Sequence, residues 1–292
     1  MQGGMKKQHR KTPQTNSKKK AVRGTAIRSF QRTVTSYYKE HGREHLPWRN
    51  TRDPYHILVS EIMLQQTQAD RVVEKYRAFI KVFPTVTALA RAPLGAVLAQ
   101  WIGLGYNRRA KTLHAAAQRI VEAHSGSVPE SESALRDLPG VGVYTAGAVL
   151  AFAYNKPVVF IDTNIRSVFI HHFFEGKGPV SDMDLLPFIE AALFGQEPRL
   201  WYAALMDYGT MLKKTGVNPG RQSAHYVRQS SFEGSARQLR GAILRMASRK
   251  PFVTIQGIVH ETRRARTEVE TQVARLIEEG FLKKKGARIT LG

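Results

Sequence analysis

Helical periodicity constrains the fold of this chain more than any other feature of its sequence. From about residue 26 to residue 230, apolar residues recur three and four positions apart, which is the spacing of one face of an α-helix. Pro, Gly and Asn interrupt the pattern at distances typical of helical hairpins. VVFI at 158–161 resembles a strand locally, but it is short and isolated among helices, and we interpret it as a buried connection. The pattern therefore predicts an all-α core.

The charge of the chain indicates a polyanionic partner. It contains 45 Lys and Arg against 23 Asp and Glu, a formal charge of +22, which favours nucleic acid or an acidic membrane surface. It has neither a run of about 18 apolar residues nor a signal-peptide core, so we expect an unexported, soluble protein whose partner is nucleic acid and not a membrane. It also contains no Cys. This excludes disulfides, thiolate zinc sites, a cysteine nucleophile and a thiolate-ligated iron–sulfur cluster.

Composition divides the chain into four segments. Residues 1–28 contain nine Lys and Arg and no acidic residue, which predicts a disordered basic arm, either solvated or in nonspecific contact with DNA. Residues 29–215 form the helical core, and residues 216–236, rich in Gly, Ser and basic residues, indicate a linker. Residues 237–292 are predicted to form three helices and a short basic β-hairpin, an order typical of a winged helix.

The stretch LPGVG at 138–142 has the composition of a tight helical hairpin, which we place at 135–150. Its Gly140 and Gly142 allow a positive φ and the close approach of another backbone. The free N–H groups of such a turn can bind an anion, so a DNA phosphate could lie there and position the duplex without reading its sequence. An ordinary glycine-capped turn is the alternative.

Two carboxylates in apolar surroundings are candidates for acid and anion roles. Glu61 follows Ile57 by four residues and Leu58 by three, so helical spacing turns it inward, where desolvation would raise its pKa and let it act as a general acid. Asp162 directly precedes a helix, whose dipole and free N–H groups would hold it as an anion. The alternatives are a Glu61 paired with a basic residue on the helix flank and an Asp162 that is a plain N-cap.

Seven motifs between about Thr35 and Leu212 form a specific set. They are LPWR (46–49), DPY (53–55), SEIMLQQTQ (60–68), FPTVTALARAP (83–93), WIGLGYNRRAKTLHAAA (101–117), LPGVGVYTAGA (138–148) and IDTN (161–164). Together they resemble the helix-hairpin-helix DNA glycosylases, the superfamily of endonuclease III, and most closely the adenine glycosylases of the MutY type. The resemblance implies a two-lobed all-α core that flips a base out of the duplex into the cleft between its lobes. Here a small winged-helix-like domain would follow that core.

The resemblance also assigns roles to individual residues. It makes Glu61 the proton donor, and it makes Asp162, assisted by Asn164, the anion that stabilises the positive charge formed on the sugar. The residues expected to line the base pocket are Trp48, Arg49 and Leu64. The residues expected to contact DNA are Gln65, Gln66, Tyr106, Gly140, Val141, Gly142 and Thr145.

Several of the side chains in these motifs have a further implied role or an alternative structural one. Gln66 and Tyr106 would enter the base stack beside the opposing guanine lesion, but Tyr106, like Trp48 and Leu64, could instead be part of the core. Tyr144 stands where bifunctional members carry a Schiff-base Lys. The resemblance therefore implies a glycosylase without lyase activity, with Tyr144 as a catalytic residue. Alternatively, Tyr144 could merely pack. Some thymine mismatch glycosylases also carry Tyr there, whereas LQQT favours adenine.

Two departures from the family pattern affect the cofactor and the C-terminal region. Most members follow the core with four Cys that hold an iron–sulfur cluster, whereas this chain has KKTGVNPGRQSAHYVRQSSFEGS. Packing or hydrogen bonds would have to fix that region, whose basic residues, Lys213 among them, could contact phosphates, and the protein should be colourless. MutY-type enzymes normally carry a further C-terminal domain that checks for 8-oxoguanine, and we expect this chain to be too short for it. The winged-helix-like segment would take its place, with basic residues suited to backbone contact: Arg263, Arg264, Arg266, Lys283, Lys284 and Lys285.

The sequence therefore predicts a monomeric, monofunctional DNA glycosylase of the cytoplasm and nucleoid. It would hydrolyse the N-glycosidic bond of adenine mispaired with guanine or 8-oxoguanine in double-stranded DNA. No cofactor is expected except a monovalent cation that the hairpin could hold. Two alternatives stay open: a thymine or uracil mismatch glycosylase, and a noncatalytic winged-helix DNA-binding protein.

Overall fold

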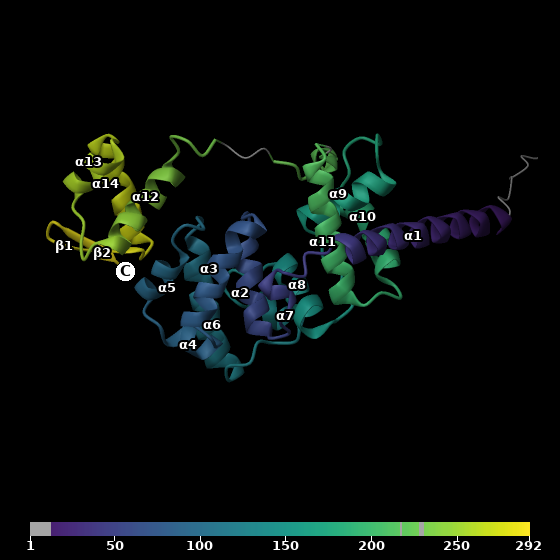
Figure 1. Ribbon diagram of the computed structural model, residues 1–292, viewed down its shortest axis with the longest axis horizontal. Helices are drawn as coiled ribbons and strands as arrows, with labels where there is room; N and C mark the ends of the chain where they lie inside the picture. The colour runs from purple at the N-terminus through teal and green to yellow at the C-terminus, as the bar shows by residue number, and fades with distance from the viewer. Residues whose placement is uncertain (1–12, 217, 228–230) are drawn as a thin grey trace, which may run out of the picture. The chain divides into compact units, whose positions relative to one another are not determined.

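The computed structural model describes residues 13–216, 218–227 and 231–292, and most of them are helical (Figure 1). The predicted all-α class is thereby confirmed. VVFI forms no strand but an irregular connection, of which Phe160 is buried. The described chain forms two compact units: one joins the N-terminal segment up to Arg43 with Ile161–Tyr226, and the other joins Glu44–Phe160 with Val227–Gly292. The predicted core of residues 29–215 thus draws on both units.

The first unit is a bundle around an aromatic core. Phe30 packs edge-on against Phe169, with ring centroids 5.0 Å apart, and against Trp201 at 5.7 Å. The chain then leaves the first helix through Arg43, whose guanidinium and backbone N–H both bind the buried Asp207. The helices of this unit are α1 (Pro13–His41), α9 (Thr163–Phe173), α10 (Asp182–Leu193), α11 (Pro198–Lys214) and the 3₁₀ turn η2 (Pro219–Gln222).

The start of α1 differs from the prediction of a disordered arm over residues 1–28. The helix begins at Pro13, so the prediction is wrong for residues 13–28, while residues 1–12 lie outside the described residues. The physical reason is visible at Ile27 and Phe30, which are buried in the unit and anchor the helix that continues through the basic segment. Composition alone does not reveal such an anchor.

The segment after α11 is held by backbone hydrogen bonds and packing. Val180 donates to the Gln222 carbonyl at 2.8 Å and accepts from Ala224 at 2.9 Å, which forms a parallel bridge. Next to it η2 packs on α9, where a Cβ added at Gly220 would lie 2.9 Å from Ser167 Oγ. Packing and hydrogen bonds therefore hold these residues in place.

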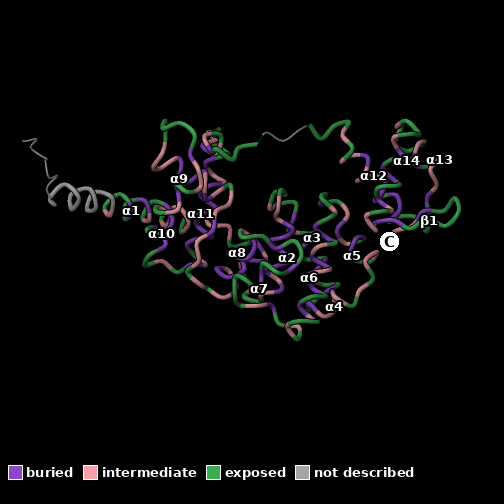
Figure 2. The backbone as a smooth tube through the Cα atoms, turned by 180° about the vertical axis from the view of Figure 1, so that it is seen from behind, coloured by how far each residue is buried: buried purple, intermediate pink, exposed green. Residues whose placement is uncertain are grey.

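The second unit begins with a helical layer around a long apolar core, drawn in purple in Figure 2. Its central helix, α2 (Pro54–Leu64), packs against α3 (Ala69–Val82) and α8 (Val143–Tyr154), because most of its residues after the first turn are apolar. Asp53 caps that helix by accepting from the N–H groups of Tyr55 and His56. The helices of this layer are η1 (Pro47–Arg49), α2 (Pro54–Leu64), α3 (Ala69–Val82), α4 (Val86–Arg91), α5 (Leu94–Trp101), α6 (Arg108–His124), α7 (Glu132–Arg136) and α8 (Val143–Tyr154).

The C-terminal segment contains the predicted order of three helices and a hairpin. Its strands pair antiparallel with Leu282 opposite Leu291, and a single bridge joins Val253 to Ile289. Its apolar side chains belong to the same buried cluster as α2 and α6. The elements are α12 (Ala236–Arg249), α13 (Ile255–Thr262), α14 (Arg266–Glu278), β1 (Leu282–Lys285) and β2 (Arg288–Leu291). Among the described residues of the whole chain, no helix has the length and apolarity needed to cross a membrane.

Candidate active site

Glu61 is buried, as predicted, and it lies in the stretch Ile57–Met63 of α2, where every residue is buried. The residue is only 5% exposed, so its carboxyl group is withdrawn from solvent. Its Oε2 accepts a hydrogen bond of 2.8 Å from the hydroxyl of Tyr144. This hydrogen bond occupies one of the two carboxyl oxygens of Glu61 as an acceptor.

Tyr144 reaches Glu61 from the first turn of α8. Its ring is also in edge contact with Phe160, with centroids 5.7 Å apart, so it packs and hydrogen-bonds at once. Phe160 can lie there because α8 carries Gly147, where a Cβ would come within 2.7 Å of the Phe160 Cβ. Neither Gly147 nor Phe160 was predicted as a site residue, and the small residues of LPGVGVYTAGA are the signal that could have indicated them.

The two glycines of the hairpin have different physical reasons. Gly140 has φ +79°, and a Cβ there would lie 2.6 Å from Thr112 Oγ1, so both conformation and close approach demand glycine, as predicted. Gly142, the N-cap of α8, has an ordinary φ of −91° and open space around the position of a Cβ. It provides no side-chain cap for the helix. A side chain at position 142 would therefore meet open space at the start of α8, and the turn itself does not require a glycine there.

Two of the predicted DNA contacts near the hairpin have buried side chains. Thr145 is 2% exposed, and its hydroxyl accepts from Nε2 of Gln65 at 3.1 Å. Val141 is 6% exposed and belongs to the core. In this structure the Thr145 side chain holds Gln65 in place and does not face solvent, because α8 packs this turn against α2.

Gln66 and Tyr106, the two residues predicted to enter the base stack, share an uncommon backbone conformation. Their φ values are +56° and +48°, in the left-handed region that non-glycine residues seldom adopt. Gln66 is exposed, and Tyr106 is 37% exposed, so neither is a core residue. Each side chain is therefore presented at the surface by a tight, strained loop.

Arg109 joins the two loops that carry these residues. Its buried guanidinium donates to the carbonyls of Met63 at 2.8 Å and Gln65 at 2.5 Å on one side, and to Gly105 at 3.0 Å on the other. Burial lowers the pKa of Arg109 to about 10, so it is still a cation at neutral pH. Arg109 was not predicted as a site residue, because nothing in GLGYNRRAK distinguishes a buried Arg from one on the surface.

The predicted base-pocket residues differ in their surroundings. Trp48 is buried in the core, edge-on to Tyr76 at 5.5 Å, which agrees with the core alternative. Leu64 is half-buried at the C-terminal end of α2 and packs on the same core. The guanidinium of Arg49 lies 5.9 Å from the centre of the Phe152 ring.

Asp162 belongs to the first unit and caps α9. Its Oδ1 accepts from the N–H groups of Asn164 at 2.8 Å and Ile165 at 2.6 Å, while its Oδ2 accepts from the Asn164 side chain at 2.9 Å. The N-cap alternative is thus correct in geometry, and it does not exclude a chemical role. Glu61 and Tyr144 are paired in one unit, and Asp162 and Asn164 are paired in the other.

The tuning of Asp162 differs from the prediction. The sequence predicts that free N–H groups hold the carboxyl as an anion, and those hydrogen bonds are present. Burial nevertheless has the larger effect and raises the pKa of Asp162, while the bonds from Ile165 and Asn164 and the charge of Lys213 lower it. The expectation of a lowered pKa was wrong because the number of side chains around a helix cap is not encoded locally.

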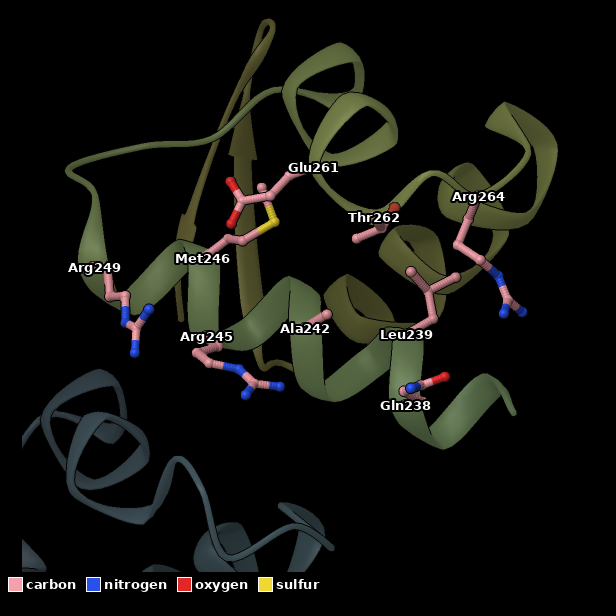
Figure 3. A pocket seen from close by; sticks show the side chains of 9 residues that line it. All are labelled: Gln238, Leu239, Ala242, Arg245, Met246, Arg249, Glu261, Thr262 and Arg264. Carbon is pink, nitrogen blue, oxygen red and sulfur yellow. The ribbon is translucent and has the colours of Figure 1, made fainter. Parts of the chain in front are cut away.

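The basic residues of the C-terminal segment fall into two groups. Arg264 donates to Glu268 from Nε and from one terminal amino group, and Arg266 donates to Glu270, so the guanidinium groups of these two predicted phosphate contacts are paired with carboxylates. Within the described part of the chain, the exposed Lys side chains of β1 form no ion pair: Lys283, Lys284 and Lys285. A hollow of about 440 Å³ lies between α12 and α13, with Arg245, Arg249 and Arg264 on its wall (Figure 3).

Comparison with known proteins relates the chain to base excision DNA repair glycosylases. Residues 59–183 match the model of the "HhH-GPD superfamily base excision DNA repair protein". An adenine DNA glycosylase of Mycolicibacterium smegmatis is 36% identical over 232 residues, which cover 72% of this chain and 78% of that protein. An adenine DNA glycosylase of Buchnera aphidicola is 40% identical over 144 residues, 49% of this chain and 41% of the relative, so the chain matches only about two fifths of that protein's length.

One solved structure extends the likeness to three dimensions. A thermostable thymine-DNA glycosylase superposes with a TM-score of 0.56 at 28% sequence identity, over 64% of this chain and 87% of its own. This share leaves out about a third of the chain.

Proposed function

Because the chain belongs to the HhH-GPD superfamily of base excision DNA repair proteins, we propose that it is a DNA N-glycosylase that removes adenine mispaired with guanine or 8-oxoguanine. The observation that carries the proposal is the buried Glu61 carboxyl bonded to Tyr144. A carboxyl in this setting suits a general acid, since its protonated form escapes the cost of burying a charge. The identity of the relatives supports adenine as the base.

The first chemical step is protonation of the base. The target adenine leaves the stack, which costs least at a mismatch, and Glu61 gives its proton to N7. Tyr144 donates to Oε2 of the same carboxyl group and holds that group in place. Protonation turns adenine into a neutral leaving group, so the bond between N9 and C1′ breaks with its electron pair going to the base.

The second step discharges the sugar. Loss of the base leaves an oxocarbenium-like sugar, which the Asp162 anion stabilises while Asn164 orients the carboxylate. Water then adds to C1′ and releases a proton, and the product is an abasic site. The reaction ends there, because Tyr144 is not an amine and forms no Schiff base with the sugar. The enzyme is therefore monofunctional.

Contacts to the DNA backbone come from the start of α8 and from basic side chains. The open space at Gly142 suits a phosphate bound by backbone N–H groups. Gln66 and Tyr106, on loops locked together by Arg109, fill the stack that the flipped base leaves. The protein works as a monomer on the nucleoid.

A thiolate-bound iron–sulfur cluster does not fit this chain. It has no Cys, and residues 218–226 are fixed by the bridge to Val180 and by packing on α9. No step of the reaction is routed through such a group. A monovalent cation at the hairpin is the one cofactor that this proposal admits.

A panel of mismatched duplexes tests the function. Adenine is placed opposite guanine, 8-oxoguanine and cytosine, and thymine and uracil opposite guanine, and released base is measured before and after alkali. We expect adenine release from the first two duplexes, with strand breaks only after alkali. Release of thymine or uracil alone would favour the activity named for the thermostable structural relative. Absence of any base release would leave a noncatalytic DNA-binding protein.

A further inference from the structure

Lys213 stands in the last turn of α11 and reaches back to the start of α9. Its Nζ donates to Asn164 Oδ1 at 2.8 Å and to Thr163 Oγ1 at 3.3 Å. Asn164 in turn donates to Asp162 Oδ2 at 2.9 Å. A continuous chain of hydrogen bonds therefore runs from a lysine ammonium through an amide to the carboxylate.

The contact of Lys213 depends on how closely the two helices approach. Gly209 lies four residues before Lys213, so both are on the same face of α11. A Cβ at Gly209 would lie 2.8 Å from both the Cβ and the carbonyl oxygen of Asn164. The glycine lets the backbones meet, and the lysine one turn later then extends along Asn164.

The ammonium fixes the orientation of the Asn164 amide. Lysine has three donors and no acceptor, so the amide group must turn its oxygen toward Lys213. Its NH₂ group is thereby turned toward Asp162, where it donates. Without Lys213 the amide could rotate by half a turn and would then set oxygen against oxygen at the carboxylate.

We propose that Lys213 is a positioning residue of the reaction centre, which orients Asn164 toward Asp162 and supplies the positive charge that favours the Asp162 anion. The inference rests on the proposed function, in which that anion stabilises the sugar cation. It assigns Lys213 to the chemistry rather than to a DNA phosphate.

The charges around Lys213 support this assignment. Burial lowers the pKa of Lys213 overall. Asp162 opposes this shift, and Arg166 adds to it. Arg166, on α9, forms an ion pair of 2.7 Å with Asp182 of α10, and His225 lies 3.9 Å from the same carboxylate. Arg166 is thus paired with Asp182, whereas the charge of Lys213 lowers the pKa of Asp162.

The first experiment needs no activity. Carboxyl ¹³C NMR follows the titration of Asp162, assigned through Asp162→Asn, in the wild type, Lys213→Met, Lys213→Arg and the exposed-lysine control Lys39→Met. We expect the pKa of Asp162 to rise in Lys213→Met and to stay near the wild-type value in the other two variants. Thermal melts establish that each variant is folded. An unchanged Asp162 titration in folded Lys213→Met would overturn the proposal.

The second experiment measures single-turnover release of adenine and duplex affinity on the same variants. We expect Lys213→Met to slow release at least about tenfold and to shift the acid limb of the pH profile to higher pH, with Lys213→Arg rescuing both. Its duplex affinity should change no more than that of Lys39→Met. A wild-type release rate combined with a larger loss of affinity would make Lys213 a phosphate contact and refute the proposal. A wild type that releases no adenine, while the NMR shift persists, would refute the proposed function alone.

Discussion

At the scale of single residues, the Glu61–Tyr144 pair is the most specific feature of the molecule. Glu61→Gln keeps the shape of the side chain but has no proton to give to N7, so excision should fall by about 10²- to 10⁴-fold. The matched control is Glu74→Gln, on the exposed side of α3, where the carboxylate only pairs with Arg77. Single-turnover assays on duplexes with adenine opposite 8-oxoguanine measure both. Full activity in Glu61→Gln would contradict the assignment of the acid.

Asp162 allows a second prediction at this scale, on stability against pH. Its pKa is raised in the folded protein, so the folded state binds more protons than the unfolded state between the ordinary aspartate pKa and the raised value. The contribution of Asp162 to stability should therefore fall as pH rises through that window. Denaturant titrations at several pH values should show wild type losing stability relative to Asp162→Asn as pH increases, although the variant is poorly active. A constant difference across pH would contradict the raised pKa.

These residues also mark what local sequence can and cannot predict. The inward direction of Glu61 follows from helical spacing, because it depends only on neighbours within one turn. The pKa of Asp162 and the hydrogen bond from Lys213 to Asn164 depend on α11. Lys213 and Asn164 are about fifty positions apart in the sequence. Burial by distant elements has no local signature, so the direction of the Asp162 pKa could not be predicted.

At the scale of elements, the hairpin separates folding from binding. Gly140→Ala should destabilise the protein by about 1–2 kcal/mol from the positive φ alone, with a further cost from the Thr112 contact. Gly142→Ala has an ordinary φ and open space, so it should leave stability unchanged but weaken duplex binding by crowding a phosphate at the start of α8. Thermal melts and binding titrations give the two readouts. Equal losses of stability in both variants would contradict this division.

The elements themselves were largely predictable, whereas their joints were not. Apolar periodicity locates α2, α3 and α6, and Asp53-Pro54 signals the start of α2. The start of α1 at Pro13 and the bridging of two loops by Arg109 arise from packing between elements. A single Arg that satisfies carbonyls on two loops looks, in the sequence, like any other basic residue of a chain with charge +22.

At the scale of the whole molecule, the charge of +22 has to be divided between residues that reach DNA and residues that serve the fold. Side chains such as Arg264 and Arg266 form ion pairs with neighbouring carboxylates, which neutralise their charge. The exposed lysines of β1 face solvent and remain able to release counterions when they meet phosphates. The effective binding charge is therefore smaller than the composition indicates.

The salt dependence of binding measures that division. Replacing Lys283, Lys284 and Lys285 by Gln should weaken duplex binding and reduce the slope of log affinity against log salt by about 0.9 for each lost phosphate contact. Arg266→Gln is the matched control, because its guanidinium is bound to Glu270 and should contribute no counterion release. Titrations between low and moderate salt give the slopes, and the excision rate at saturating enzyme should stay the same. If the triple variant keeps the wild-type slope, the β1 lysines do not touch the duplex, and the C-terminal segment serves a partner other than DNA.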